Sequence, residues 1–138
     1  MSYNINEEGT WLTGARVVSS PNCDTRPLDT EIDLLIIHGI SLPPKEYGGG
    51  YIDKLFTNTL PPDDHPYFMK IKELHVSSHL LIDRQGSVTQ YVPFDMRAWH
   101  AGESTFDGRN NCNDYSIGIE LEGCDEEAYQ KDQYLVLA

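Results

Sequence analysis

The spacing of apolar and polar residues changes several times along the chain, which predicts a fold that mixes strands with helices. Ile32 to Ile37 is a short aliphatic run rich in β-branched residues, typical of a strand buried on both faces. Residues 76–82 and 87–92 are strand-like runs joined by Asp83-Arg84-Gln85-Gly86, and such a connection predicts a β-hairpin. Tyr115 to Glu122 alternates between apolar and polar residues, which indicates a further strand.

Apolar residues three and four positions apart predict a short helix at Tyr51 to Phe56, followed by a second short segment at Tyr67 to Leu74. Another helix is expected from Glu126 onward, with Asp125 as its N-cap and an apolar face formed by Tyr129, Tyr134 and Leu135. Residues 1–30 lack a sustained period, so we expect an arm that wraps around the body. The length of 138 residues suits a single domain, residues 1–138, of the α/β class.

Composition and charge narrow the possible partners and the compartment. The formal net charge is −12 and only ten residues are Lys or Arg, which argues against nucleic acid or an anionic membrane as a partner. No apolar run reaches the roughly 18 residues that a membrane helix needs. The N-terminus is acidic and polar, unlike a secretory signal, and three cysteines without metal-type spacing favour free thiols in a reducing cytoplasm.

His38 is the histidine whose position most favours chemistry. It ends the aliphatic strand and precedes a long loop, Gly39 to Gly50, that contains two prolines and three consecutive glycines. The end of a buried strand is where α/β sheets usually bind ligands. No HExxH or paired CxxC pattern accompanies it, so a structural role stays open. His79 lies inside the hairpin and is more simply a core imidazole, while His100 is left undecided.

Two acidic residues and one tryptophan are further candidates. Glu120 and Glu122 share one face of the alternating strand and are most simply explained as solvent-facing carboxylates. If that strand is central, Glu120 is desolvated instead, its pKa is raised, and it can act as a general base. Trp99 is either a packing residue or a platform for a ligand.

Several longer stretches together resemble one known family. The stretch around His38 resembles the first zinc-ligand strand of the cytoplasmic zinc amidases called AmpD, which are 1,6-anhydro-N-acetylmuramyl-L-alanine amidases of the type 2 amidase and peptidoglycan recognition protein superfamily. The similarity is collinear over essentially the whole chain. The segments that carry it include Leu34 to Pro44, His65 to Phe68, Gln90 to Asp95, Arg97 to Gly102 and Cys112 to Gly123, and the three long motifs among them are together specific.

The resemblance implies a central mixed β-sheet flanked by helices. It also implies zinc-dependent hydrolysis of the amide between N-acetylmuramyl and L-alanine in peptidoglycan fragments, during cell-wall recycling. His38 matches a zinc ligand, and Glu120 matches the carboxylate thought to activate the attacking water. Ser78 stands where other amidases carry a tyrosine. Tyr67 and Trp99 lie in segments expected to line the groove for the muropeptide substrate.

One departure from the family pattern affects function. Members of the family carry two further zinc ligands and a lysine on a segment beyond the position of Ala138. We therefore expect a C-terminally truncated member that is inactive alone and has part of one sheet face uncovered. A non-catalytic muropeptide-binding module is the alternative from a different class, and an interaction fragment without a ligand is the third possibility.

Overall fold

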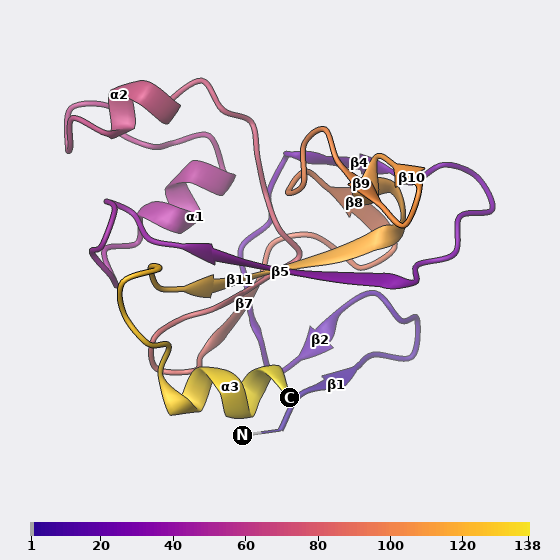
Figure 1. The fold of residues 1–138 in the computed structure, drawn as a ribbon. Coiled ribbons are helices and arrows are strands. Elements are labelled where there is room, and N and C mark those ends of the chain that lie inside the picture. Colours follow the sequence, from indigo (N-terminus) through magenta and orange to yellow (C-terminus); the bar gives the residue numbers. More distant parts are fainter. Residues whose placement is uncertain (1) are drawn as a thin grey trace.

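The computed structural model describes residues 2–138 and contains a five-stranded mixed β-sheet at its centre (Figure 1). β11 lies between β5 and β6 and runs parallel to both, whereas β6 and β7 form the antiparallel hairpin that the sequence predicts. β3 joins β7 in parallel and completes the order β3-β7-β6-β11-β5. The strands are β3 (Arg16–Val17), β5 (Leu34–Ile40), β6 (Leu80–Ile82), β7 (Val88–Gln90) and β11 (Ser116–Glu122).

Three pairs of short strands and three short helices surround this sheet. In Figure 1, α1 and α2 lie on one side of the sheet and α3 on the other. The predicted N-terminal arm contains short strands that pair with each other, with β7 and with β8. These elements are β1 (Asn4–Ile5), β2 (Leu12–Thr13), β4 (Cys23–Thr25), β8 (Met96–Ala98), β9 (Thr105–Phe106), β10 (Arg109–Asn110), the 3₁₀ helix η1 (Cys112–Tyr115), α1 (Tyr51–Phe56), α2 (Phe68–Ile71) and α3 (Lys131–Leu137).

The alternation of side chains in β6 explains why the protein has two hydrophobic cores. Leu81 points to the side of α1 and α2 and packs with Phe56 and Phe68, both of which are almost completely buried. Leu80 and Ile82 point to the opposite side and belong to the core against which the end of α3 packs. The expected central mixed sheet flanked by helices is confirmed.

The structure corrects the expectation that the aliphatic strand is buried on both faces. β5 is an edge strand with β11 as its one neighbour in the sheet. Leu35 is 55% exposed and Ile37 is 41% exposed, because the elements described on that side do not extend over them. This exposed apolar surface agrees with the expectation of a partly uncovered sheet face. A run of aliphatic residues does not by itself distinguish an edge strand from a central one.

The start and the inward face of the last helix were also predicted incorrectly. α3 begins at Lys131, where Gln130 and Gln133 form a capping box, rather than at Glu126 after an Asp125 cap. Its fully buried residue is Gln133, whose amide nitrogen donates to the carbonyls of Ile82 and Glu122. Because an amide can bond the ends of two strands, a polar residue takes the inward position. Tyr134 and Leu135 are 53% and 64% exposed.

Candidate active site

The register of the two longest strands places the two main candidate residues side by side. Glu120 on β11 is directly opposite His38 on β5, and side chains at paired positions emerge from the same face of a sheet. Because β11 is central and both of its faces are covered, Glu120 is only 9% exposed. The simpler sequence interpretation, a solvent-facing carboxylate, is therefore wrong.

Glu120 is a buried acid without a hydrogen-bond partner for one of its oxygens. Within residues 2–138, its Oε2 atom is the buried side-chain oxygen that makes no hydrogen bond. Burial raises the pKa of the Glu120 carboxyl from 4.5 to about 7, because the charged form loses its hydration. A carboxyl that titrates near neutral pH can accept a proton and return it, which is the property of a general base.

His38 presents a neutral imidazole on the same face. Its Nε2 lies 2.9 Å from Nδ1 of His100, and the two rings meet edge to face with centroids 5.2 Å apart. Partial burial lowers the pKa of His38, which favours the uncharged ring. In the described part of the chain, Nδ1 of His38 makes no hydrogen bond, so this nitrogen is available to a ligand.

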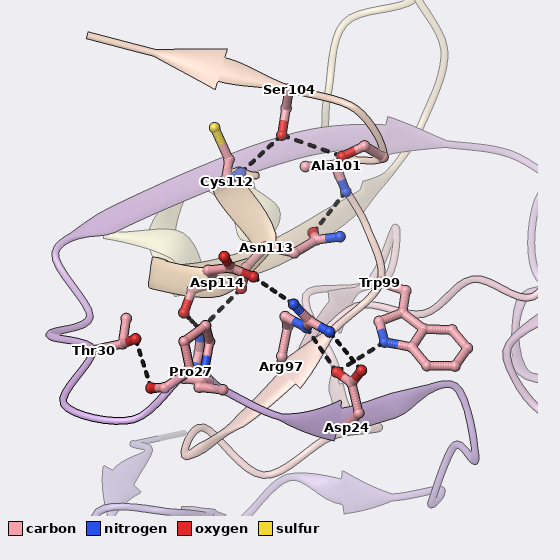
Figure 2. A network of polar contacts seen from close by, with 12 residues as sticks. Asp24, Pro27, Thr30, Arg97, Trp99, Ala101, Ser104, Cys112, Asn113 and Asp114 are labelled. Atoms are coloured by element: carbon pink, nitrogen blue, oxygen red, sulfur yellow. Dashed lines mark hydrogen bonds and ion pairs between the residues drawn. The ribbon is translucent and has the colours of Figure 1, made fainter. Parts of the chain in front are cut away.

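His100 is the residue that connects His38 to β11. Its Nε2 lies 3.1 Å from the Ser116 hydroxyl, and its ring occupies the space above Gly118. A Cβ at position 118 would lie 2.4 Å from Cγ of His100, so glycine is required there. The Oδ1 atom of Asn113 accepts the backbone N–H groups of His100 and Ala101 and holds this loop in place. Figure 2 shows the contact with Ala101.

His79, whose ring lies 6.1 Å from that of His100, is a core imidazole, and the sequence interpretation of this residue is confirmed. His79 is fully buried, its Nδ1 accepts the Gly118 N–H at 3.1 Å, and its Nε2 donates to the Met96 carbonyl at 2.9 Å. Burial is the largest cause that lowers the pKa of His79 to about 4 and that of His100 to about 3. The positive charge of Arg26 lowers both pKa values further.

Arg26 is a structural residue that sequence reasoning missed, because it lies in residues 1–30, where no sustained period points to buried positions. The residue is 8% exposed, and its guanidinium donates to four backbone carbonyls, which belong to Phe94, Asn113, Asp114 and Ser116. These carbonyls come from segments on either side of the loop that carries His100. Arg26 therefore fixes the backbone around the candidate site.

Trp99 and Tyr67, the two predicted groove residues, lie in different parts of the fold. The Trp99 indole donates to Asp24, and Asp24 also forms an ion pair with Arg97 (Figure 2). Arg97 extends this network to Asp114 on η1. Tyr67 precedes α2 and packs against the core around α1 and α2. Their contact with a substrate remains a prediction.

Two further polar residues near the candidate site have structural roles. Ser78, at the position where other amidases carry a tyrosine, is fully buried, and its hydroxyl donates to the Leu80 carbonyl. Glu122 is buried two residues after the candidate base and accepts the backbone N–H groups of Gly48 and Arg84. Glu122 therefore holds the loop that follows β5 close to the end of β11.

The residues present fit a zinc ion in part. His38 offers a neutral imidazole nitrogen, a preferred donor for zinc, beside the unpartnered carboxylate oxygen of Glu120. In the stretch from residue 2 to residue 138, no three His, Cys, Asp or Glu side chains come together as a metal site. Zinc sites in enzymes use three protein ligands. The described residues therefore supply one ligand and not a complete set.

Comparison with known proteins identifies the class to which this fold and site belong. Residues 28–138 match the family model described as N-acetylmuramoyl-L-alanine amidase. The chain therefore belongs to the N-acetylmuramoyl-L-alanine amidase family. Among its relatives, the 1,6-anhydro-N-acetylmuramyl-L-alanine amidase AmpD of Escherichia coli (strain K12) is 58% identical over 132 residues, which make up 96% of this chain and 72% of the relative. The corresponding AmpD of Salmonella typhimurium (strain SL1344) is 59% identical over 93% of this chain and 68% of its own length.

Solved structures agree with this assignment. A crystal structure of a selenomethionine derivative of AmpD superposes with a TM-score of 0.91 at 58% identity, covering 93% of this chain and 72% of that one. The solution structure of Citrobacter freundii AmpD gives a TM-score of 0.64 at 57% identity, covering 97% of this chain and 71% of that one. The resemblance read from the sequence motifs is thus confirmed.

Proposed function

We propose that this protein acts on the amide bond between N-acetylmuramyl and L-alanine in peptidoglycan fragments, with anhydro-muramyl peptides as the substrate class, in cell-wall recycling. The observation that carries the proposal is the buried, unpartnered carboxyl of Glu120 beside the neutral imidazole of His38. The family membership and the printed names of the relatives support the choice of substrate.

Each of the two central residues has a distinct proposed role. Glu120 accepts a proton from the attacking water and delivers it to the leaving amine of L-alanine, since its pKa of about 7 allows both transfers near neutral pH. His38 is the residue that would hold zinc, through its free Nδ1. When bound, zinc lowers the pKa of a water molecule and polarises the scissile carbonyl.

We further propose that the 138-residue chain does not turn over by itself. Its described residues provide one zinc ligand, and one imidazole does not hold zinc usefully. The test measures bound zinc and muramyl-peptide hydrolysis on the chain and on a version extended with the C-terminal segment of Citrobacter freundii AmpD. We expect zinc and turnover only in the extended version. Stoichiometric zinc with turnover in the 138-residue chain would contradict this proposal.

The extended version also tests the role of Glu120. Its Glu120→Gln variant should retain zinc and lose hydrolysis by about 10²- to 10⁴-fold, the usual contribution of a general base. The matched control, Glu73→Gln, changes an exposed glutamate and should leave the rate unchanged. Unchanged hydrolysis in Glu120→Gln would exclude Glu120 as the base. Alanine variants of Tyr67 and Trp99 should weaken muropeptide binding if these residues line the groove.

A non-catalytic muropeptide-binding module is the second candidate function. It is favoured by one observation, the lack of a three-donor metal group in the part of the chain that the structure describes. Titrating a muropeptide into the 138-residue chain with a chelator present separates the two. Binding without metal, combined with no hydrolysis by the extended version, supports the module. No binding to either version would support an interaction fragment without a ligand.

The proposed compartment is the cytoplasm. The three cysteines Cys23, Cys112 and Cys124 are free thiols, as suits a reducing environment. Among residues 2–138, none of the helices combines the length and the apolar character needed to cross a bilayer. Detection of the chain with an antibody in the cytoplasmic fraction of cells, compared with the periplasmic fraction, tests this assignment.

A further inference from the structure

A short chain of hydrogen bonds runs from His38 through His100 to Ser116. Nε2 of His38 lies 2.9 Å from Nδ1 of His100, and Nε2 of His100 lies 3.1 Å from the hydroxyl oxygen of Ser116. Each neutral imidazole carries one proton, so each ring donates through one nitrogen and accepts through the other. The chain can therefore run in only two directions.

The two directions leave different atoms of His38 free. If His38 donates from Nε2, then His100 accepts at Nδ1 and donates from Nε2 to Ser116, and Nδ1 of His38 keeps its lone pair. If Ser116 donates, the bonds reverse, Nε2 of His38 becomes the acceptor and Nδ1 carries the proton. The second arrangement leaves His38 with no lone pair for a ligand.

We propose that His100 is a positioning residue that, together with Ser116, holds His38 in the tautomer protonated at Nε2 and so presents Nδ1 of His38 to a metal. The inference rests on the proposed function, since only a His38 that meets a metal requires that tautomer. His100 is the histidine whose role was left undecided from the sequence pattern. Partners that orient a metal-binding histidine typically change metal affinity by about 10- to 100-fold when removed.

The fold holds His100 rigidly enough for this role. The backbone N–H groups of His100 and Ala101 both donate to Oδ1 of Asn113, at 3.1 and 2.9 Å. The ring fits against Gly118, where no larger residue leaves room. His100 is therefore fixed from its backbone and from its ring, and its two nitrogens can face His38 and Ser116 only in this orientation.

The experiment uses the 138-residue chain and records the imidazole nitrogen resonances of His38 at neutral pH by NMR. In the unmodified chain we expect Nε2 of His38 to show the protonated signal and Nδ1 the unprotonated one. His100→Phe keeps an aromatic ring but has no nitrogen, and should shift both signals toward the average of the two tautomers. His100→Asn, whose amide oxygen can accept in place of Nδ1, should restore the separation. His75→Phe, at an exposed histidine, is the matched control and should change nothing.

Two outcomes would overturn the inference: His38 protonated at Nδ1 in the unmodified chain, or unchanged signals in His100→Phe. If His100→Phe does not fold, Ser116→Ala decides, since loss of one hydroxyl should also reduce the separation of the His38 signals and an unchanged spectrum would refute the role. The measurement needs neither metal nor substrate. It can therefore fail while the extended version still hydrolyses muramyl peptides, and it can succeed while that hydrolysis fails.

Discussion

Replacing Glu120 by Gln should change how the stability of this protein depends on pH. Glutamine has nearly the same shape as glutamate but carries no charge at any pH. In the folded protein the Glu120 carboxyl titrates at about 7, because it is buried without a counter-charge, whereas the ordinary value is 4.5. The folded state therefore keeps a proton on Glu120 over a range of pH in which the unfolded state has already lost it.

The direction and size of the effect follow from this difference. Below pH 4.5 both states are protonated and Glu120 imposes no ionisation penalty on folding. As the pH rises from 4.5 to about 7, the unfolded state is increasingly favoured, and above about 7 the penalty is constant. At about 1.4 kcal/mol per pH unit, this interval corresponds to a stability loss of about 3 kcal/mol. Glu120→Gln removes that loss.

The assay is urea unfolding of the 138-residue chain and of its Glu120→Gln variant between about pH 4 and about pH 8. The variant should gain stability relative to the parent as the pH rises, by up to about 3 kcal/mol. The buried histidines are common to both proteins, so their contributions cancel in the comparison. Glu73→Gln, at an exposed glutamate, should run parallel to the parent. A parallel curve for Glu120→Gln would show that Glu120 is not desolvated.

Three other substitutions test the packing around the site. Gly118→Ala should displace the whole ring of His100 and cost about 1–3 kcal/mol by overpacking. Gly39→Ala would meet only the hydroxyl end of the Tyr129 side chain, which can move aside, and should cost less; equal costs would contradict the close fit at Gly118. Arg26→Met should lower the free energy of unfolding in urea by at least about 3 kcal/mol, because four carbonyls lose their donor. A decrease below about 1 kcal/mol would show that water replaces the guanidinium. Leu35→Lys should reduce self-association, measured by light scattering, without lowering the melting temperature, since Leu35 is 55% exposed on an edge strand. Unchanged scattering would show that this edge does not self-associate.

Local sequence patterns predicted the parts of the fold that depend on neighbouring residues. The hairpin of β6 and β7 and the alternating strand β11 follow from period-two spacing and a glycine-containing turn. The burial of Glu120 could be given only as a condition, because it depends on whether β11 is central. Strand order is a property of the whole chain, and no pattern within eight residues determines it.

The features that were missed depend on contacts between distant parts of the chain. His38 and His100 are separated by 62 positions, and Arg26 reaches a carbonyl at Ser116, 90 positions away. No spacing rule connects such residues. The helix α3 was misplaced for a different reason. Its inward residue is Gln133, whose amide donates to carbonyls of two strands, and a search for regularly spaced apolar residues does not detect a buried glutamine.

The polar face of β11 accounts for most of the candidate site. Ser116 ends the hydrogen-bond chain from His100, Gly118 makes room for its ring, and Glu122 accepts two backbone N–H groups. A strand covered on both faces must provide partners for its polar groups, because each unpaired one costs about 1–3 kcal/mol. Glu120 is the exception, with an oxygen that the described residues leave unpartnered. Glu122 shows that a carboxylate on this strand can be paired with backbone N–H groups, so the unpaired oxygen of Glu120 supports the proposed role of Glu120 as the group that accepts and releases a proton.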